Sequence, residues 1–98
     1  MKRTVRLREE ADRHVNSAAT WYQKQRAGLG HDFLDELLST FQSIVERPLT
    51  YPVMYRNTRR ALLRRFPFAV YFRVEARQIV VTAVLHGSRH PRRWQSRK

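Results

Sequence analysis

Polar and apolar residues alternate over residues 3–8, and this period of two predicts a half-buried strand. From Glu9 onward the apolar residues are spaced four, three and four apart, as on one face of a helix: Ala11, Val15, Ala18 and Tyr22. Acidic residues at the start of this segment stabilise the positive end of a helix dipole. The run Gly-Leu-Gly at residues 28–30 predicts that the helix ends near Arg26.

A second helix is predicted up to Arg47, with Asp32 as its N-cap or first-turn acid and Pro48 as its stop. Its apolar stripe has helical spacing, and we expect all of it to be core: Phe33, Leu34, Leu37, Leu38, Phe41, Ile44 and Val45. Because few residues join the two helices, they are expected to pack as an antiparallel hairpin.

Residues 48–58 are predicted to be a loop, because Pro48 and Pro52 cannot donate to a strand ladder. Three segments of strand length follow at residues 59–65, 68–75 and 79–85, and the short breaks between them predict a meander. The middle segment alternates cleanly, with Phe68, Val70, Phe72 and Val74 on one face. The last segment is apolar on both faces, which is typical of an interior strand.

This order of elements predicts an α+β fold of the type β-α-α-β-β-β. The antiparallel helical hairpin would pack on one face of a small, mostly antiparallel sheet. The 98 residues suffice for one core, so a single domain over residues 1–98 is expected. The opposite sheet face carries Tyr71 and Arg73, and we expect it to be the working surface.

The positive charge is concentrated in the second half of the chain. Residues 1–47 carry eight Lys and Arg against seven Asp and Glu, whereas residues 48–98 carry twelve against Glu75 alone. Such an excess costs stability by self-repulsion and favours a polyanionic partner: RNA, DNA, an acidic protein or a membrane surface. A solvated basic face without a partner is the alternative.

The chain contains no cysteine, which excludes disulfides and cysteine-based zinc sites and fits a reducing compartment. No apolar segment follows the basic N-terminus as in a signal peptide, and the longest apolar run, residues 79–85, is too short to span a bilayer. A cytoplasmic protein without a membrane partner is therefore expected. No pair of histidines has metal-site spacing with carboxylate support, so neither a metal nor another cofactor is expected.

Several short motifs, in this order and spacing, cover most of the chain. They are residues 18–22 (Ala-Ala-Thr-Trp-Tyr), 28–30, Phe33-Leu34, Pro48, Tyr51-Pro52, residues 64–68 (Arg-Arg-Phe-Pro-Phe), Tyr71, His86, Arg89, His90, Pro91 and Trp94. Together they resemble the RelE/ParE superfamily, the toxins of bacterial type II toxin–antitoxin modules, also called plasmid stabilisation proteins. The resemblance implies a cognate antitoxin, encoded adjacently and acidic, that masks the toxin's active surface. It also implies growth inhibition either by binding DNA gyrase, as in ParE-like members, or by cutting mRNA on the ribosome, as in RelE-like members.

A metal-independent endoribonuclease needs a group that accepts the 2′ proton, cations that stabilise the phosphate and an acid for the leaving oxygen. By resemblance Arg89 matches the C-terminal arginine of RelE-like enzymes, and His90 would act as acid or base. Supporting roles would fall to Arg65, Arg73 and His86, although His86 suits a structural role equally well. Two departures weaken this interpretation: Ala69 stands where a catalytic arginine is expected, and Trp94 where a tyrosine is common.

Contacts with the target or the antitoxin are predicted for the basic and aromatic residues of the second half: Arg59, Arg60, Arg64, Arg65, Tyr71, Arg73, Arg92, Arg93 and Trp94. Their guanidinium groups would bind phosphates or antitoxin carboxylates. Alternatively, the arginines only keep an edge strand from pairing, and Trp94 packs as a lid. Gyrase binding is slightly favoured, a ribosome-dependent mRNA endoribonuclease is the alternative, and a basic nucleic-acid-binding module or inactive toxin is the third possibility.

Overall fold

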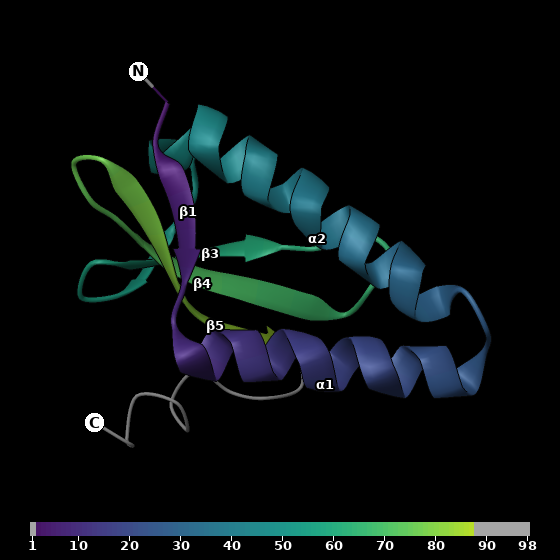
Figure 1. Cartoon of the computed structure of the whole chain (residues 1–98). Coiled ribbons are helices and arrows are strands. Elements are labelled where there is room, and N and C mark those ends of the chain that lie inside the picture. The colour runs from purple at the N-terminus through teal and green to yellow at the C-terminus, as the bar shows by residue number, and fades with distance from the viewer. Residues whose placement is uncertain (1, 88–98) are drawn as a thin grey trace.

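The computed structural model describes residues 2–87 of the chain, in which two helices cover one face of a five-stranded sheet (Figure 1). The elements are β1 (Thr4–Leu7), α1 (Glu9–Gln25), α2 (Leu29–Glu46), a short 3-10 helix (Pro48–Thr50), β2 (Val53–Tyr55), β3 (Thr58–Leu62), β4 (Phe68–Val74) and β5 (Gln78–His86). The predicted α+β class and the helical hairpin on a mostly antiparallel sheet are confirmed.

The strand order is β1-β5-β4-β3-β2, so β5 lies between β1 and β4 as its two apolar faces predicted. β1 and β5 run parallel. Parallel neighbours cannot be joined by a tight turn, and here the helical hairpin forms the first part of the long connection between them. A bulge interrupts the pairing of β4 and β5, since Tyr71 lies opposite Ala83 while Phe72 lies opposite Val81. The extra residue, Thr82, donates its hydroxyl to the carbonyl of Tyr71 at 3.2 Å.

Two features stabilise the turn between the helices: the backbone conformation of Gly28 and the side chain of Gln23. Gly28 has φ of 91°, a left-handed conformation that glycine adopts without steric cost. The Gln23 side-chain oxygen accepts hydrogen bonds from the N–H groups of Gly28 and Gly30, at 3.1 and 3.2 Å. Gly28 is therefore the N-cap of α2, and Asp32 is its first-turn acid.

The expectation that residues 48–58 form an unpaired loop was wrong. Both prolines precede residues 53–55, so they leave this short stretch free to pair as β2 along the edge of β3. β3 is shorter than the predicted segment 59–65 and ends at Leu62. The Leu63 N–H still donates to the Phe68 carbonyl, and beyond it the Glu36 carboxylate of α2 accepts the backbone N–H groups of Arg64 and Arg65.

An aromatic cluster lies where the hairpin meets the sheet. Phe33 of α2 is fully buried, with its ring centroid 5.5 Å from Tyr22 of α1, 5.4 Å from Phe66 and 5.2 Å from Phe68. Burial raises the pKa of the Tyr22 phenol above its usual 10.0. The folded chain holds that proton more tightly than the unfolded chain, so this contribution to stability is lost as pH rises above 10.

Neither helix of the part of the chain that the structure describes is long and apolar enough to cross a membrane.

Candidate binding surface

The sheet face away from the helices carries two of the predicted binding arginines. Arg60 on β3 lies opposite Tyr71 on β4, and Arg73 follows two residues later on the same face. Tyr71 is itself buried with Ala69 and Leu85, so its ring offers little surface to a partner. The prediction that Tyr71 and Arg73 share the uncovered face agrees with the register, which also places Arg60 there, but the accessible part of that surface is its arginines.

Arg73 is held by the carboxylate of Glu75, which follows the end of β4. Its guanidinium lies 3.3 Å from Glu75, whose other carboxylate oxygen accepts a hydrogen bond from Gln78 at 2.8 Å. The Glu75 carbonyl also accepts from the Arg3 side chain at 2.6 Å. The single acidic residue of the cationic half thus partly neutralises Arg73 and ties the β4–β5 turn to the start of β1.

Arg59 faces the other side of the sheet from Arg60. Its guanidinium donates to the backbone carbonyls of Leu49 and Tyr51, at 3.4 and 2.7 Å. These bonds fix the short 3-10 helix against β3. The Arg59 guanidinium therefore binds the protein's own backbone, and its role in this geometry is to position the 3-10 helix.

Arg64 and Arg65 lie on the loop between β3 and β4, which α2 holds from one side. The Glu36 carboxylate accepts both of their backbone N–H groups, with Arg65 at 3.0 Å. The Arg65 side chain lies 3.9 Å from Asp32 and 5.6 Å from the centre of the Phe66 ring. Two carboxylates of the helical half thus set the position of this cationic loop.

We expect Glu36→Gln to lower the free energy of unfolding by about 1 kcal/mol, because an amide oxygen replaces a charged acceptor of two N–H groups at a partly exposed site. Urea denaturation measures the change, and hydrogen exchange of the Arg64 and Arg65 amides should become faster. Glu46→Gln on the same helix is the matched control, because no described contact uses its carboxylate. Equal effects of the two substitutions would contradict the clamp.

The residues proposed to support RNA cleavage are not brought together. The strand register places His86 opposite Phe68 at one end of β4, whereas Arg73 lies near the other end, opposite Val80. Five residues of extended chain separate Phe68 from Arg73, which is about 17 Å. Arg65 lies on the loop beside α2. The remaining predicted site residues, Arg89, His90, Arg92, Arg93 and Trp94, lie outside the described residues.

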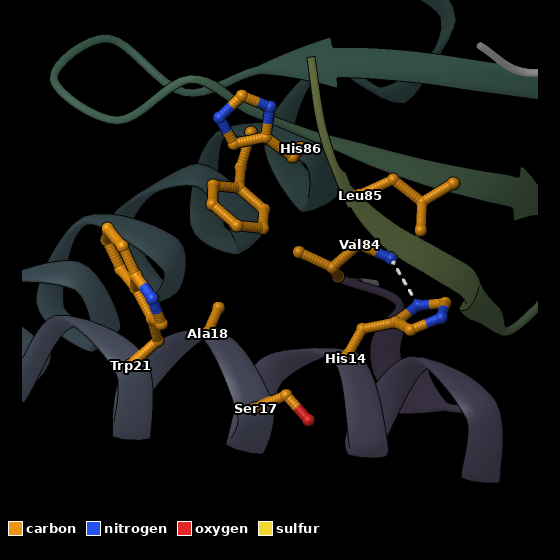
Figure 2. A pocket seen from close by; sticks show the side chains of 8 residues that line it. His14, Ser17, Ala18, Trp21, Val84, Leu85 and His86 are labelled. Atoms are coloured by element: carbon orange, nitrogen blue, oxygen red, sulfur yellow. Dashed lines mark hydrogen bonds between the residues drawn. The ribbon is translucent and has the colours of Figure 1, made fainter. Parts of the chain in front are cut away.

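His86 lines a small pocket of ≈ 290 Å³ between α1 and β5, together with His14 and Trp21 (Figure 2). The His86 ring lies 5.4 Å from the Phe68 ring in an edge-on arrangement. The Nδ1 atom of His14 accepts a hydrogen bond from the Val84 N–H at 3.1 Å. His14 is half-buried, and this bond satisfies a backbone N–H of β5 beyond the end of β1.

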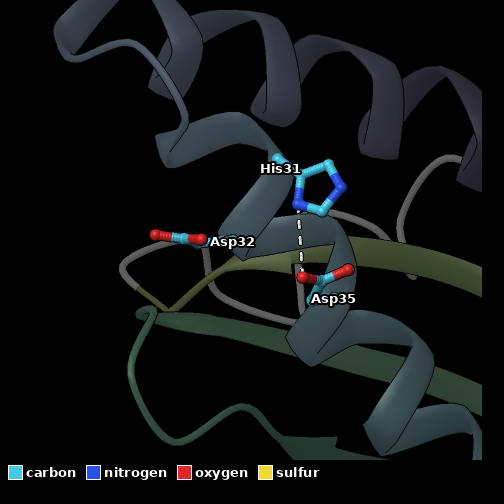
Figure 3. Close-up of side chains that lie close together, drawn as sticks. All are labelled: His31, Asp32 and Asp35. Carbon is cyan, nitrogen blue, oxygen red and sulfur yellow. Dashed lines mark ion pairs between the residues drawn. The ribbon is translucent and has the colours of Figure 1, made fainter.

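Three side chains at the start of α2, His31, Asp32 and Asp35, could reach a common cation, because their ligand atoms lie within 4.8 Å of one another. In Figure 3 the Asp32 carboxylate is directed away from the other two side chains. His31 and Asp35 form an exposed pair at 3.2 Å, and Asp32 lies near Arg65. The positive end of the helix dipole disfavours a cation here, so these contacts are better explained as ion pairs.

Two leucines of α2 form an exposed apolar ridge, the leucine seam, consisting of Leu34 and Leu38. They are 37% and 60% exposed, so the expectation that the whole α2 stripe is core was wrong for both. Leu34 borders a groove of ≈ 490 Å³ shared with α1, and Leu38 borders one of ≈ 510 Å³ shared with β1. The signal was present in the sequence, because the seven apolar positions of α2 cover more of the helix than one core-facing stripe requires.

Comparison with known proteins supplies the context for these surfaces. The chain matches, over residues 5–91, the model of a family described as the ParE toxin of the type II toxin–antitoxin system, parDE. It is also similar in structure to a chain of the chromosomal ParDE toxin–antitoxin system from P. aeruginosa, with a TM-score of 0.75 and 14% sequence identity. That match covers 86% of this chain and 95% of the other, and at this identity it shows a shared fold. No curated protein matches the chain significantly.

Proposed function

The chain belongs to the ParE toxin family of type II toxin–antitoxin systems, and on that basis we propose that it stops growth by binding DNA gyrase and not by cutting RNA. The observation that carries the proposal is the strand register, which keeps Arg73 and His86 at opposite ends of β4. Proton transfer in RNA cleavage requires groups within hydrogen-bond reach of one phosphate. A binding mode has no such requirement.

The antitoxin, as we propose, covers the leucine seam. Leu34 and Leu38 are one helical turn apart, and grooves flank the ridge that they form. An amphipathic helix of a partner places apolar residues at the same spacing and would bury both leucines. A ParDE system is also what the structurally similar chain from P. aeruginosa belongs to, which supports a partner of the antitoxin class.

Induced expression of the chain in a bacterial host tests the proposal. We expect growth arrest, inhibition of purified gyrase in a supercoiling assay, and no new cleavage sites by primer extension on translated mRNA. Co-expression with a cognate antitoxin, which we expect to be a short acidic protein encoded adjacently, should restore growth. Ribosome-dependent cuts together with unaffected gyrase would overturn the gyrase proposal and favour the nuclease.

The second candidate, a ribosome-dependent mRNA endoribonuclease, is supported by two enclosed nitrogen atoms on the helix-free face. The Nε atoms of Arg60 and Arg73 are buried and have no acceptor among the described residues. A phosphate that contacts the outer nitrogens of both guanidinium groups would balance this charge. If this candidate is correct, the cuts seen by primer extension should be lost in Arg73→Ala while the variant still folds.

A further inference from the structure

The C-terminal end of β3 has an open backbone edge. The Arg60 N–H donates to the Pro52 carbonyl on the β2 side at 3.1 Å, and the Leu63 N–H donates to the Phe68 carbonyl on the β4 side at 3.0 Å. Backbone groups alternate between the two sides of a strand, so the Leu62 N–H and C=O point toward the β2 side.

No strand reaches Leu62 on that side within residues 2–87. β2 begins at Val53, and its register with β3 covers only Thr58 and Arg59. Pro52 makes the last bond of this pairing through its carbonyl, and proline has no N–H to continue the ladder. The edge at Leu62 is therefore unpaired and available to a further strand.

The side chains along this edge alternate in chemistry. Leu62 is 63% exposed on the face without helices, and Arg60, two residues earlier, shares that face. Arg64, two residues later, is exposed as well. We call the row Arg60, Leu62 and Arg64 the β3 edge. It presents cation, aliphatic and cation in sequence, with the open backbone groups of Leu62 in the middle.

Positive charge predominates around the β3 edge, and the carboxylates that reach it, Glu36 and Asp32, come from α2. Residues 47–74 contain no Asp or Glu. The Glu36 carboxylate is engaged by backbone N–H groups, and the buried Arg60 Nε has no acceptor in the described part of the chain. A partner that supplies carboxylates at this edge would therefore meet uncompensated positive charge.

Three occupants can be compared on these grounds. A second copy of the chain would set Arg60 and Arg64 against the same residues of its neighbour, and like charges directly opposite each other destabilise a strand pair. A nucleic acid would gain from the arginines but would leave the Leu62 side chain and the open backbone groups without matching contacts. An extended protein segment matches all of these features.

We propose that the β3 edge binds an acidic extended segment of the toxin's protein target, which adds a strand to the sheet. Its backbone would pair with the N–H and C=O of Leu62, an apolar residue would cover Leu62, and carboxylates on either side would pair with Arg60 and Arg64. This inference rests on the proposed binding function and deepens it by assigning the surface and the chemistry of the partner segment.

The test compares two exposed apolar residues on different surfaces. Leu62→Glu places a carboxylate against the acidic segment, whereas Trp21→Glu alters α1 beside β5 and serves as the control, and the two side chains are 63% and 57% exposed. With purified gyrase as the probe, we expect Leu62→Glu to raise the concentration needed to inhibit supercoiling by about tenfold or more. Trp21→Glu should inhibit like the wild-type chain, and both variants should remain folded in chemical denaturation.

Leu62→Pro separates strand addition from side-chain contact. Proline removes only the N–H that points to the open edge, and proline is tolerated at such positions of edge strands. We expect Leu62→Pro to lose inhibition as Leu62→Glu does. If both variants inhibit like the wild type while Arg60→Ala and Arg64→Ala do not, guanidinium contacts alone carry the binding and the proposal is wrong.

Growth arrest distinguishes failure of this inference from failure of the gyrase proposal. If the wild-type chain arrests growth without inhibiting gyrase, another target is involved, and the same variants are compared by growth. Loss of arrest in Leu62→Glu and Leu62→Pro, but not in Trp21→Glu, would then still support the β3 edge. Full arrest by both Leu62 variants would overturn it, whichever target is correct.

Discussion

Phe33→Ala should lower the free energy of unfolding by about 3–5 kcal/mol, the largest stability effect expected of a single core substitution in this chain. Phe33 is fully buried, and its ring touches aromatic rings from α1 and from the loop and strand that follow β3: Tyr22, Phe66 and Phe68. Without the ring, the protein loses the free energy gained by burying the ring's apolar surface. It also loses the van der Waals contacts of the atoms that line the cavity left behind. Small domains are stable by only about 5–15 kcal/mol, so the variant would be close to unfolding.

Chemical denaturation measures this loss, and Leu34→Ala is the control at the next position. Leu34 lies on the exposed seam, so its truncation should cost less than about 1 kcal/mol. Phe33→Leu keeps most of the volume and should stay folded if Phe33→Ala does not, with a smaller loss. Similar midpoints for Phe33→Ala and Leu34→Ala would show that the aromatic cluster does not hold the hairpin on the sheet.

Gly30→Ala should cost about 1–3 kcal/mol or more, because an added Cβ would lie 2.5 Å from the backbone carbonyl oxygen of Ala19. The two helices approach so closely here that only a hydrogen atom fits between them. The opposing atom belongs to the backbone of α1, so a side-chain rotation cannot relieve the clash. The whole hairpin would have to open.

Gly28→Ala is the matched control in the same turn. A Cβ at Gly28 would meet nothing within 4 Å, but its φ of 91° is strained for alanine, so the expected cost is about 1 kcal/mol. Denaturation midpoints should therefore rank wild type, Gly28→Ala and Gly30→Ala in falling order. Ala19→Gly should not rescue Gly30→Ala, because it leaves the carbonyl in place. A rescue by that substitution would contradict the backbone clash.

The candidate site was harder to predict than the fold. The sequence shows which residues are positively charged, but the sheet decides which of its two faces each of them occupies. Arg59 and Arg60 are neighbours in sequence, yet Arg59 bonds the backbone of residues 49 and 51 and Arg60 lies on the helix-free face. Leu62 is one position of the predicted strand at residues 59–65, and its neighbours in sequence do not distinguish it. That it marks the open edge depends on where β2 begins, and the strand at residues 53–55 was not predicted.

The amphipathic periods, the glycines of the turn and the proline stop were enough to predict both helices, the meander and the interior place of β5, because each depends on residues close together in the chain. The bulge at Thr82, the clamp by Glu36 and the exposure of Leu38 involve elements that meet only after folding. Which arginines remain available to a partner is likewise settled by carboxylates 2 to 33 positions away, as for Arg73 with Glu75 and Arg65 with Asp32. Local sequence patterns do not indicate which distant residues come into contact. Tertiary packing therefore decides which arginines of the cationic half stabilise the fold and which face outward.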